Sequence, residues 1–124
     1  MGFAVSMYNK VKGTRFEIEL EEYYNMEGFK ARRLPRAGTK DIGDIAIELK
    51  NNHVVVVEAK NVKANDVLQW LREADIEAEH YSQKYDTPAY GIVVRKTRGT
   101  NASGAVVMMS QETLQNLLRW NGLT

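Results

Sequence analysis

The sequence predicts a single α/β domain in which a central mixed β-sheet is flanked by helices. Apolar residues recur at helical spacing in three segments and follow strand-like patterns in five, in the order α-β-β-β-α-β-β-α. The chain has 124 residues, of which 44% are hydrophobic, and this is enough for one hydrophobic core. No linker-like segment divides it, so we expect residues 1–124 to form one domain.

The first helix is predicted over about residues 12–26. Apolar and aromatic residues recur there at helical spacing, and Gly28 supplies a stop signal. The recurring residues are Phe16, Leu20, Tyr23 and Tyr24. We expect residues 1–11, which precede this pattern, to form a flexible or arm-like N-terminus.

Three strands are expected next. Residues 29–35 alternate like a short strand that Pro35 ends, and a loop rich in glycine and basic residues follows. Two Val/Ile-rich runs then flank a polar turn, which predicts a β-hairpin over about residues 43–49 and 54–59.

The C-terminal half returns to alternating helices and strands. The elements are predicted as a helix at 64–85, strands at 88–96 and 105–109, and a helix at 110–120. Asp66 and Ser110 lie near the starts of the two helices, where their side chains can accept hydrogen bonds from backbone N–H groups. A flexible loop is expected at 97–104.

The register of the hairpin decides which side chains share a face of the sheet. A two-residue loop would place the apolar rows of the two strands on opposite faces, whereas a three-residue loop at residues 51–53 would align them. The three-residue loop buries more apolar surface, so we predict it, with Ala46 opposite Glu58 and Asp44 opposite Lys60. Asp44, Glu58 and Lys60 then lie on one face.

Two carboxylates and a lysine at a strand end suit phosphodiester hydrolysis. Asp44 and Glu58 repel each other unless a cation lies between them, and their hard oxygen atoms favour Mg²⁺ or Mn²⁺. Such an ion can activate a water, and Lys60 can hold that water or stabilise a developing oxyanion. The alternative is that the Glu-x-Lys sequence is an ordinary solvated pair on an exposed strand.

Composition narrows the chemistry further. The chain has no cysteine, which excludes disulfides, thiolate metal sites and cysteine nucleophiles and fits a reducing compartment. The net charge is +1, so any surface that attracts nucleic acid has to be local. No apolar run approaches the ~20 residues of a membrane span, so we expect no membrane partner.

Two local groups of basic residues are candidates for DNA contact. The first precedes Asp44 and contains no acid between its members, which are Lys30, Arg32, Arg33, Arg36 and Lys40. The second lies at a strand end and in the loop after it, and consists of Arg95, Lys96 and Arg98. Contacts to phosphates would supply affinity without sequence information. The alternative for the first group is a solvated edge strand that its lysines protect from pairing.

The hairpin resembles the PD-(D/E)xK nuclease pattern. In GDIAIELKNNHVVVVEAK, Asp44, Glu58 and Lys60 hold the motif positions. The preceding segments narrow the resemblance to archaeal-type, phage-like Holliday junction resolvases. KGTRFE resembles the K-G-x-x-x-E start of that family, with Glu17 as its helix-borne acid, and GFKARRLPRAG resembles its short strand and Pro/Gly loop. The similarity is good over residues 12–60 and continues only in the order of elements.

The resemblance implies a restriction-endonuclease-like core and a homodimer that cuts four-way DNA junctions symmetrically with Mg²⁺, for which Mn²⁺ can substitute, and without a nucleotide cofactor. It assigns the metal to Asp44, Glu58 and the backbone carbonyl of Ala59. It places Glu17 in the same acidic cluster, in contact with the metal through water, and it implies that Lys60 positions the attacking water.

The resemblance also suggests which residues surround this centre. The expected DNA contacts are Lys12, Arg33, Arg36, Thr39, Lys40, Arg95 and Lys96. Ala37 occupies the place of a catalytically important loop serine of some relatives, and Thr39 is the nearest hydroxyl. Asp41 and Gln69 are the candidates for supporting the site, although Asp41 can also be an ordinary loop residue and an ordinary surface position is the favoured interpretation of Gln69.

We therefore expect a metal-dependent, structure-selective endonuclease that hydrolyses phosphodiesters of four-way DNA junctions as a symmetric dimer. Apolar residues of the last strand and helix would supply the dimer interface, namely Met108, Met109, Leu117 and Trp120. A cytoplasmic location, at a nucleoid or a viral replication site, follows from this expectation. The alternatives are another PD-(D/E)xK nuclease that acts on flaps or other branched or duplex DNA, and a non-enzymatic DNA-binding module.

Overall fold

Helices and strands follow one another in the order that the sequence predicts. The computed structural model describes residues 2–36, 38 and 40–120, and of residues 2–6 it describes only the backbone. The helices are α1 (Gly2–Met26), α2 (Val67–Tyr85) and α3 (Gln111–Trp120), with a short 3-10 helix, η1 (Ala102–Gly104). The strands are β1 (Ala31–Arg33), β2 (Ile45–Glu48), β3 (Val54–Lys60), β4 (Ala89–Arg95) and β5 (Val106–Met108).

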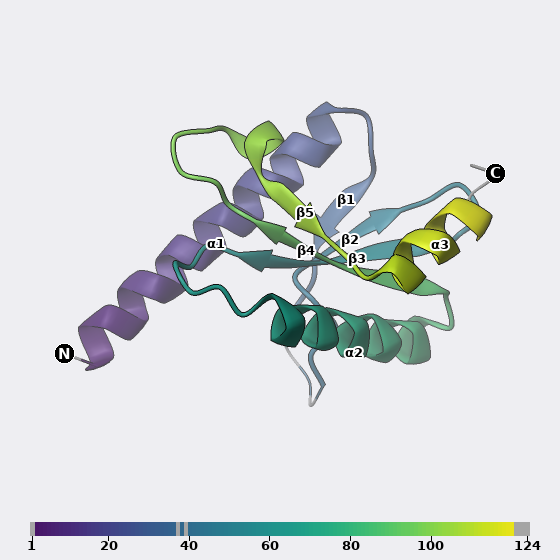
Figure 1. Cartoon of the computed structure of the whole chain (residues 1–124), viewed down its shortest axis with the longest axis horizontal. Helices are drawn as coiled ribbons and strands as arrows, with labels where there is room; N and C mark the ends of the chain where they lie inside the picture. Colours follow the sequence, from purple (N-terminus) through teal and green to yellow (C-terminus); the bar gives the residue numbers. More distant parts are fainter. Residues whose placement is uncertain (1, 37, 39, 121–124) are drawn as a thin grey trace.

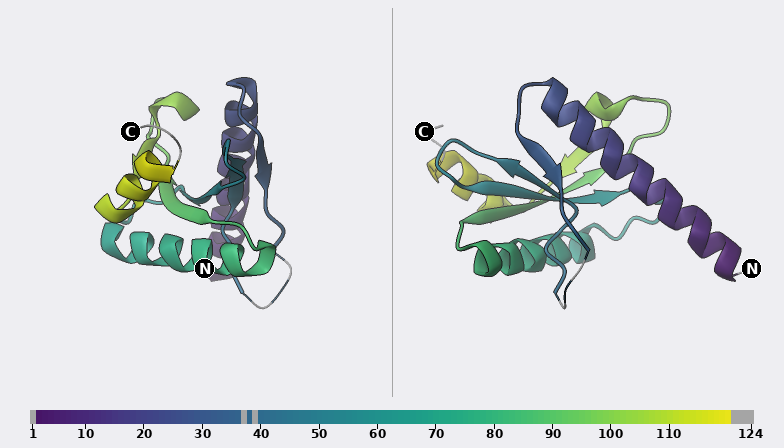
Figure 2. Two further views of the ribbon diagram at one scale, coloured as in Figure 1. Left: turned by 90° about the vertical axis from the view of Figure 1, so that its right-hand side faces the viewer. Right: turned by 180° about the vertical axis from the view of Figure 1, so that it is seen from behind.

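The strands form one mixed sheet in the order β1-β2-β3-β4-β5. β3 and β4 run parallel and are joined through α2, and the other neighbours are antiparallel. α1 and α2 lie on opposite faces of this sheet, and the first turns of α1 project beyond it (Figures 1 and 2). The predicted α/β architecture, a mixed sheet flanked by helices, is confirmed.

Each face of the sheet has its own hydrophobic core, because alternate side chains of β2, β3 and β4 point to opposite sides. The α1 side buries Phe16, Leu20, Ile45, Ile47, Val55, Val57, Ile92 and Val94. The α2 side buries Trp70, Ala74, Ala78 and Tyr81 of the helix over Ala46, Val54, Val56 and Val93 of the strands. The two layers fix β3, whose C-terminal end carries the charged residues of interest, between the two helices.

The hairpin has the predicted alignment of faces but a different register. Ala46 pairs with Val56 rather than with Glu58, and the loop closes where the Leu49 N–H donates to the His53 carbonyl at 2.8 Å. The turn is therefore Lys50-Asn51-Asn52, and Asn52 supplies the positive φ of 62°. His53, just before β3, is held beside β4 by a 2.6 Å hydrogen bond between its Nδ1 and the Tyr90 hydroxyl. Because the shift is two residues, every side chain keeps its predicted face.

Three other local predictions were wrong. α1 begins at Gly2 rather than at residue 12, since no proline interrupts the N-terminal segment and Gly13 is tolerated within a helix. The Asp66 side chain makes no capping hydrogen bond, although Asp66 is the N-cap of α2. The apolar spacing of residues 64–85 also places Leu68 on the apolar face of this helix, but Leu68 is exposed, whereas Trp70 is buried. In the described part of the chain, none of the helices combines the length and apolar character needed to span a membrane.

Candidate active site

The predicted catalytic residues line one cleft of about 470 Å³ beside α1 and the C-terminal end of β3. The predicted site residues in this cleft are Glu17, Arg33, Arg36, Asp44, Glu58, Ala59 and Lys60. They come from α1, the end of β1, the loop between β1 and β2, and β3, so segments far apart in the sequence meet here.

Asp44 is held at the cleft by two hydrogen bonds with the backbone of β3. Its N–H donates to the Val57 carbonyl at 2.9 Å, and its carboxylate accepts the Ala59 N–H at 2.9 Å. Gly43 precedes it with a φ of +99°, and a Cβ there would lie 2.3 Å from Cγ1 of Val56. The close approach of this loop to β3, which buries Asp44, therefore requires a glycine.

Arg36 joins two of the carboxylates. Its guanidinium bonds to the Glu17 carboxylate and lies 3.0 Å from Oδ1 of Asp44, while Arg33 lies 3.6 Å from the other oxygen of Glu17. Burial, together with the charges of Glu58 and Glu17, nevertheless raises the pKa of Asp44 to about 7. The carboxylates are thus crowded enough that one arginine does not neutralise them.

Lys60 lies beside Glu58 and is itself oriented by α2. Its Nζ is 3.7 Å from Oε1 of Glu58 and 3.5 Å from the carboxylate of Glu73, and it lies 5.7 Å from the ring centre of Trp70. These contacts hold the ammonium group next to the carboxylates, where it can donate to a water or to an oxyanion.

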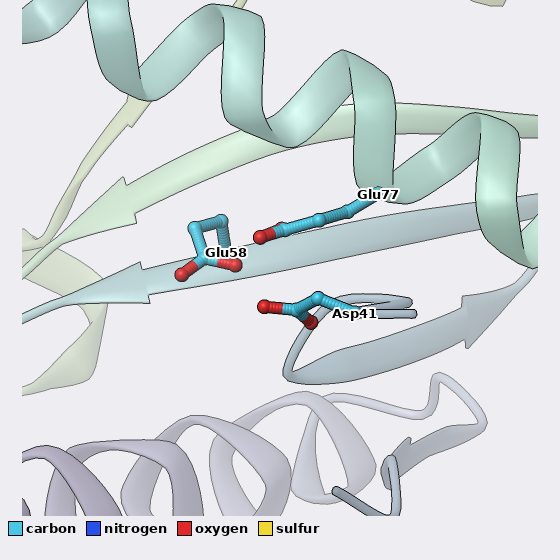
Figure 3. A group of neighbouring side chains, drawn as sticks. All are labelled: Asp41, Glu58 and Glu77. Carbon is cyan, nitrogen blue, oxygen red and sulfur yellow. The ribbon is translucent and has the colours of Figure 1, made fainter. Parts of the chain in front are cut away.

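Glu77 of α2 is a buried acid that the sequence reasoning missed. It is 6% exposed and points toward Glu58 and Asp41 (Figure 3). Carboxylate oxygens of Asp41, Glu58 and Glu77 all lie within 4.8 Å of one another. Burial first, and then the hydrogen bond and charge of Glu58, raise the pKa of Glu77 to about 11. The helical spacing from Ala74 to Tyr81 places Glu77 on the buried stripe of α2, which is the signal that could have identified it.

A basic groove continues from the cleft. It measures about 590 Å³, shares Asn61 and Val62 with the cleft, and is lined by the basic residues Lys12, Lys63, Arg95, Lys96 and Arg98. Lys40 lies in a separate hollow of about 240 Å³ that Arg36 and Asp41 also line. The described candidate DNA contacts therefore line the cleft, the basic groove and this hollow.

Some predicted contacts are already engaged within the protein. Arg95 donates to Asn65 at 3.0 Å and lies 5.4 Å from the ring centre of Trp70, and Lys96 forms a 2.9 Å salt bridge with Glu19. Gln69 is exposed and donates to Glu73 at 3.3 Å, so it reaches Lys60 only through that carboxylate. Ala37 and Thr39 lie outside the described residues.

Comparisons with known proteins identify the family. The family model for archaeal Holliday junction resolvase (Hjc) matches residues 8–114. Among solved structures, the chain is similar to the 1.6 Å structure of Archaeoglobus fulgidus Hjc, a Holliday junction resolvase from an archaeal hyperthermophile. The TM-score is 0.48 and the identity 18%, over 90% of this chain and 96% of that chain. No curated protein matches. Because the family model spans well over half of the sequence, the chain belongs to the archaeal Holliday junction resolvase family, a family of metal-dependent DNA endonucleases.

Proposed function

We propose that this chain hydrolyses phosphodiester bonds of four-way DNA junctions, with Mg²⁺ or Mn²⁺, in the cleft described above. The observation that carries the proposal is the meeting of Glu17, Asp44, Glu58 and Lys60 in one cleft that opens into a basic groove. Acids and a lysine at the end of a strand supply the hydrolytic groups, and the groove supplies phosphate contacts.

The donor set fits a hard divalent cation. Oε2 of Glu58 is buried and accepts no hydrogen bond from an N–H group of the described residues, and the carboxylates of Asp44 and Glu17 already share one positive group, the Arg36 guanidinium. Asp44, Glu58 and the carbonyl of Ala59 would hold the ion, with Glu17 in contact through water. When bound, the ion would lower the pKa of a water and neutralise charge on a phosphoryl oxygen.

The chain's own groups then orient the reaction. Lys60 donates to the attacking water or to the developing negative charge on the phosphate. Glu73 and Trp70 position its ammonium group. Arg33 and Arg36, which also line the cleft, bind the phosphates that flank the cleaved bond.

A symmetric junction requires two such centres, and we propose that a homodimer provides them. Large apolar side chains are exposed on β5 and α3, which supports an interface there. These are Val106 (50% exposed), Val107 (51%), Leu114 (39%) and Trp120 (55%). The predicted interface residues Met108, Met109 and Leu117 belong to the same two elements and the segment between them.

The test is cleavage of a synthetic four-way junction in Mg²⁺ by the wild type and by Glu58→Gln. We expect the wild type to nick the junction and the variant to lose at least about 10²-fold in rate while still binding the junction in Ca²⁺. Glu48→Gln, which changes an exposed carboxylate of the same hairpin, is the matched control. Equal cleavage of flaps or plain duplex would favour a nuclease of different substrate range, and binding with no cleavage by the wild type would contradict the proposal.

A further inference from the structure

Three carboxylates converge between Glu58 and α2. Asp41 comes from the loop before β2, Glu58 from β3 and Glu77 from α2 (Figure 3). Their oxygens lie within 4.8 Å of one another. Two oxygens on opposite sides of one ion are about 4.2–4.8 Å apart when the metal–oxygen distances are about 2.1–2.4 Å, so the space suits a single divalent cation.

Two buried carboxylate oxygens of this cluster have no partner outside it. Oε2 of Glu77 and Oε2 of Glu58 accept no hydrogen bond from an N–H or a hydroxyl group of the described residues, their one polar contact being the hydrogen bond between the two carboxyl groups, and the Glu77 residue is 6% exposed. A buried carboxylate oxygen without a partner costs free energy, and natural proteins retain such groups where a ligand satisfies them. Glu77 extends from α2, which lies on the opposite face of the sheet from α1. It does not line the cleft of Glu17 and Asp44, so that cleft does not explain why its side chain points toward Glu58.

Among the described residues, one cation, Lys60, forms a salt bridge with this cluster, and it does so at Glu58. Neither Asp41 nor Glu77 forms a salt bridge within the described ranges, and Lys60 reaches only Oε1 of Glu58, at 3.7 Å. The Asp41 loop is fixed from both sides, because its carboxylate accepts the Gly43 N–H at 2.9 Å and its backbone carbonyl accepts from Nδ1 of His80 at 2.8 Å. Groups outside the cluster therefore hold Asp41 in place.

We propose that Asp41, Glu58 and Glu77 form a second divalent-cation site, for Mg²⁺ or Mn²⁺, that shares Glu58 with the ion of the proposed hydrolytic centre. The Glu58 carboxylate would contribute to both ion positions. The second ion would neutralise Glu77, the acid of α2 that faces Glu58. The site rests on the proposed function only through the shared Glu58, because its own ligands Asp41 and Glu77 lie outside the lining of the cleft.

The test is Mn²⁺ binding to the full chain without DNA, followed by electron paramagnetic resonance of the free ion. We expect the wild type to bind one more Mn²⁺ per chain than either Glu77→Gln or Asp41→Asn. Glu79→Gln, an exposed glutamate of the same helix, keeps the wild-type number. Asp41 is exposed, so Asp41→Asn tests the site without altering the core.

Equal numbers of ions on the wild type, Glu77→Gln and Asp41→Asn would overturn the site, and the three acids would then be a proton-sharing cluster only. Junction cleavage separates this outcome from failure of the proposed function. If the wild type cuts junctions and the ion numbers are equal, the function stands and the second site does not. If the wild type cuts no junction but Glu77→Gln and Asp41→Asn each lose one ion, the second site stands and the function does not.

Discussion

The Asp44 carboxyl lies buried beside Glu58 and Glu17, and these surroundings raise its pKa to about 7 from the ordinary value of 3.8. The folded protein therefore binds a proton at Asp44 between about pH 4 and pH 7 that the unfolded chain has released. Stability falls with rising pH wherever the folded state binds more protons. Without a divalent ion, ionisation of Asp44 consequently works against folding across this range.

We predict that Asp44→Asn stabilises the metal-free protein at pH 7. The gain over the wild type grows between about pH 4 and pH 7, levels off above, and reaches about 2–4 kcal/mol, since one pKa unit corresponds to about 1.4 kcal/mol. Urea unfolding in a chelator at several pH values measures it. Mg²⁺ stabilises the wild type alone, and an advantage of the variant that does not change with pH would contradict this account.

At Lys60 we predict a loss of rate without a loss of binding. Lys60→Met keeps the length of the side chain but removes the ammonium group beside Glu58, so we expect junction cleavage to fall by about 10²–10⁴-fold. Affinity for the junction in Ca²⁺ changes less than threefold. Lys63→Met, which lies in the basic groove, is the control and affects binding more than the cleavage rate of bound junction.

The acids on strands could be assigned to the site from the sequence, whereas the acid on α2 could not. Asp44, Glu58 and Lys60 could be grouped from alternation along strands, because any three-residue loop, whether at 50–52 or at 51–53, puts them on one face. Glu77 could not be singled out as easily, since most acids on a helix are solvated and only the packing of α2 on β3 and β4 shows that this one is buried. The roles of these residues stay predictions until the variants are measured.

At the level of elements, the contact of α2 with β4 depends on a glycine. A Cβ on Gly91 would lie 2.3 Å from the backbone oxygen of Ala74, so the strand and helix could not keep their present separation. We predict that Gly91→Ala destabilises the protein by about 2–4 kcal/mol, as overpacking against backbone does. Unfolding in urea measures the change.

The matched control for that variant is Gly13→Ala. Gly13 lies within α1 and nothing lies within 4 Å of an added Cβ, so the same substitution there is expected to stabilise by about 0.5–1 kcal/mol. Equal effects at the two positions would show that backbone entropy, rather than the approach of α2 to β4, governs Gly91.

Element boundaries show what sequence patterns could not supply. The eight elements and their order followed from periodicity, but the start of α1 did not, because residues 2–11 lack the amphipathic pattern of a packed helix and simply continue the helix beyond the sheet. The exact hairpin register also required knowledge of Tyr90, a residue of β4 that bonds to His53 from a neighbouring strand. Long-range contacts of this kind are invisible to local patterns.

For the whole molecule, the arrangement of grooves predicts how binding depends on salt. Lys12 and its basic neighbours line a groove continuous with the cleft, so we expect Lys12→Gln to weaken junction binding and to reduce the slope of log K against log[salt] by about 1. Lys50→Gln, in the hairpin turn, is the control and leaves the slope unchanged. Fluorescence anisotropy in Ca²⁺ at several salt concentrations measures both.

The exposed apolar residues of β5 and α3 predict where copies of the chain meet. We expect Val107→Glu to place a charge in the interface and to shift the protein from dimer to monomer in analytical ultracentrifugation. The monomer should retain its fold by circular dichroism and nick only one strand of a junction per encounter. A dimer of unchanged affinity would place the interface elsewhere.

Arg36 gives the metal-free enzyme an internal counter-ion, since its guanidinium occupies the position between Glu17 and Asp44. We predict that a bound metal ion would neutralise these two carboxylates in place of Arg36, which is on an exposed loop, and would allow the arginine to contact a phosphate instead. The metal-free chain is therefore expected to bind a junction more weakly than the metal-bound chain, and so to release a substrate that it cannot cut.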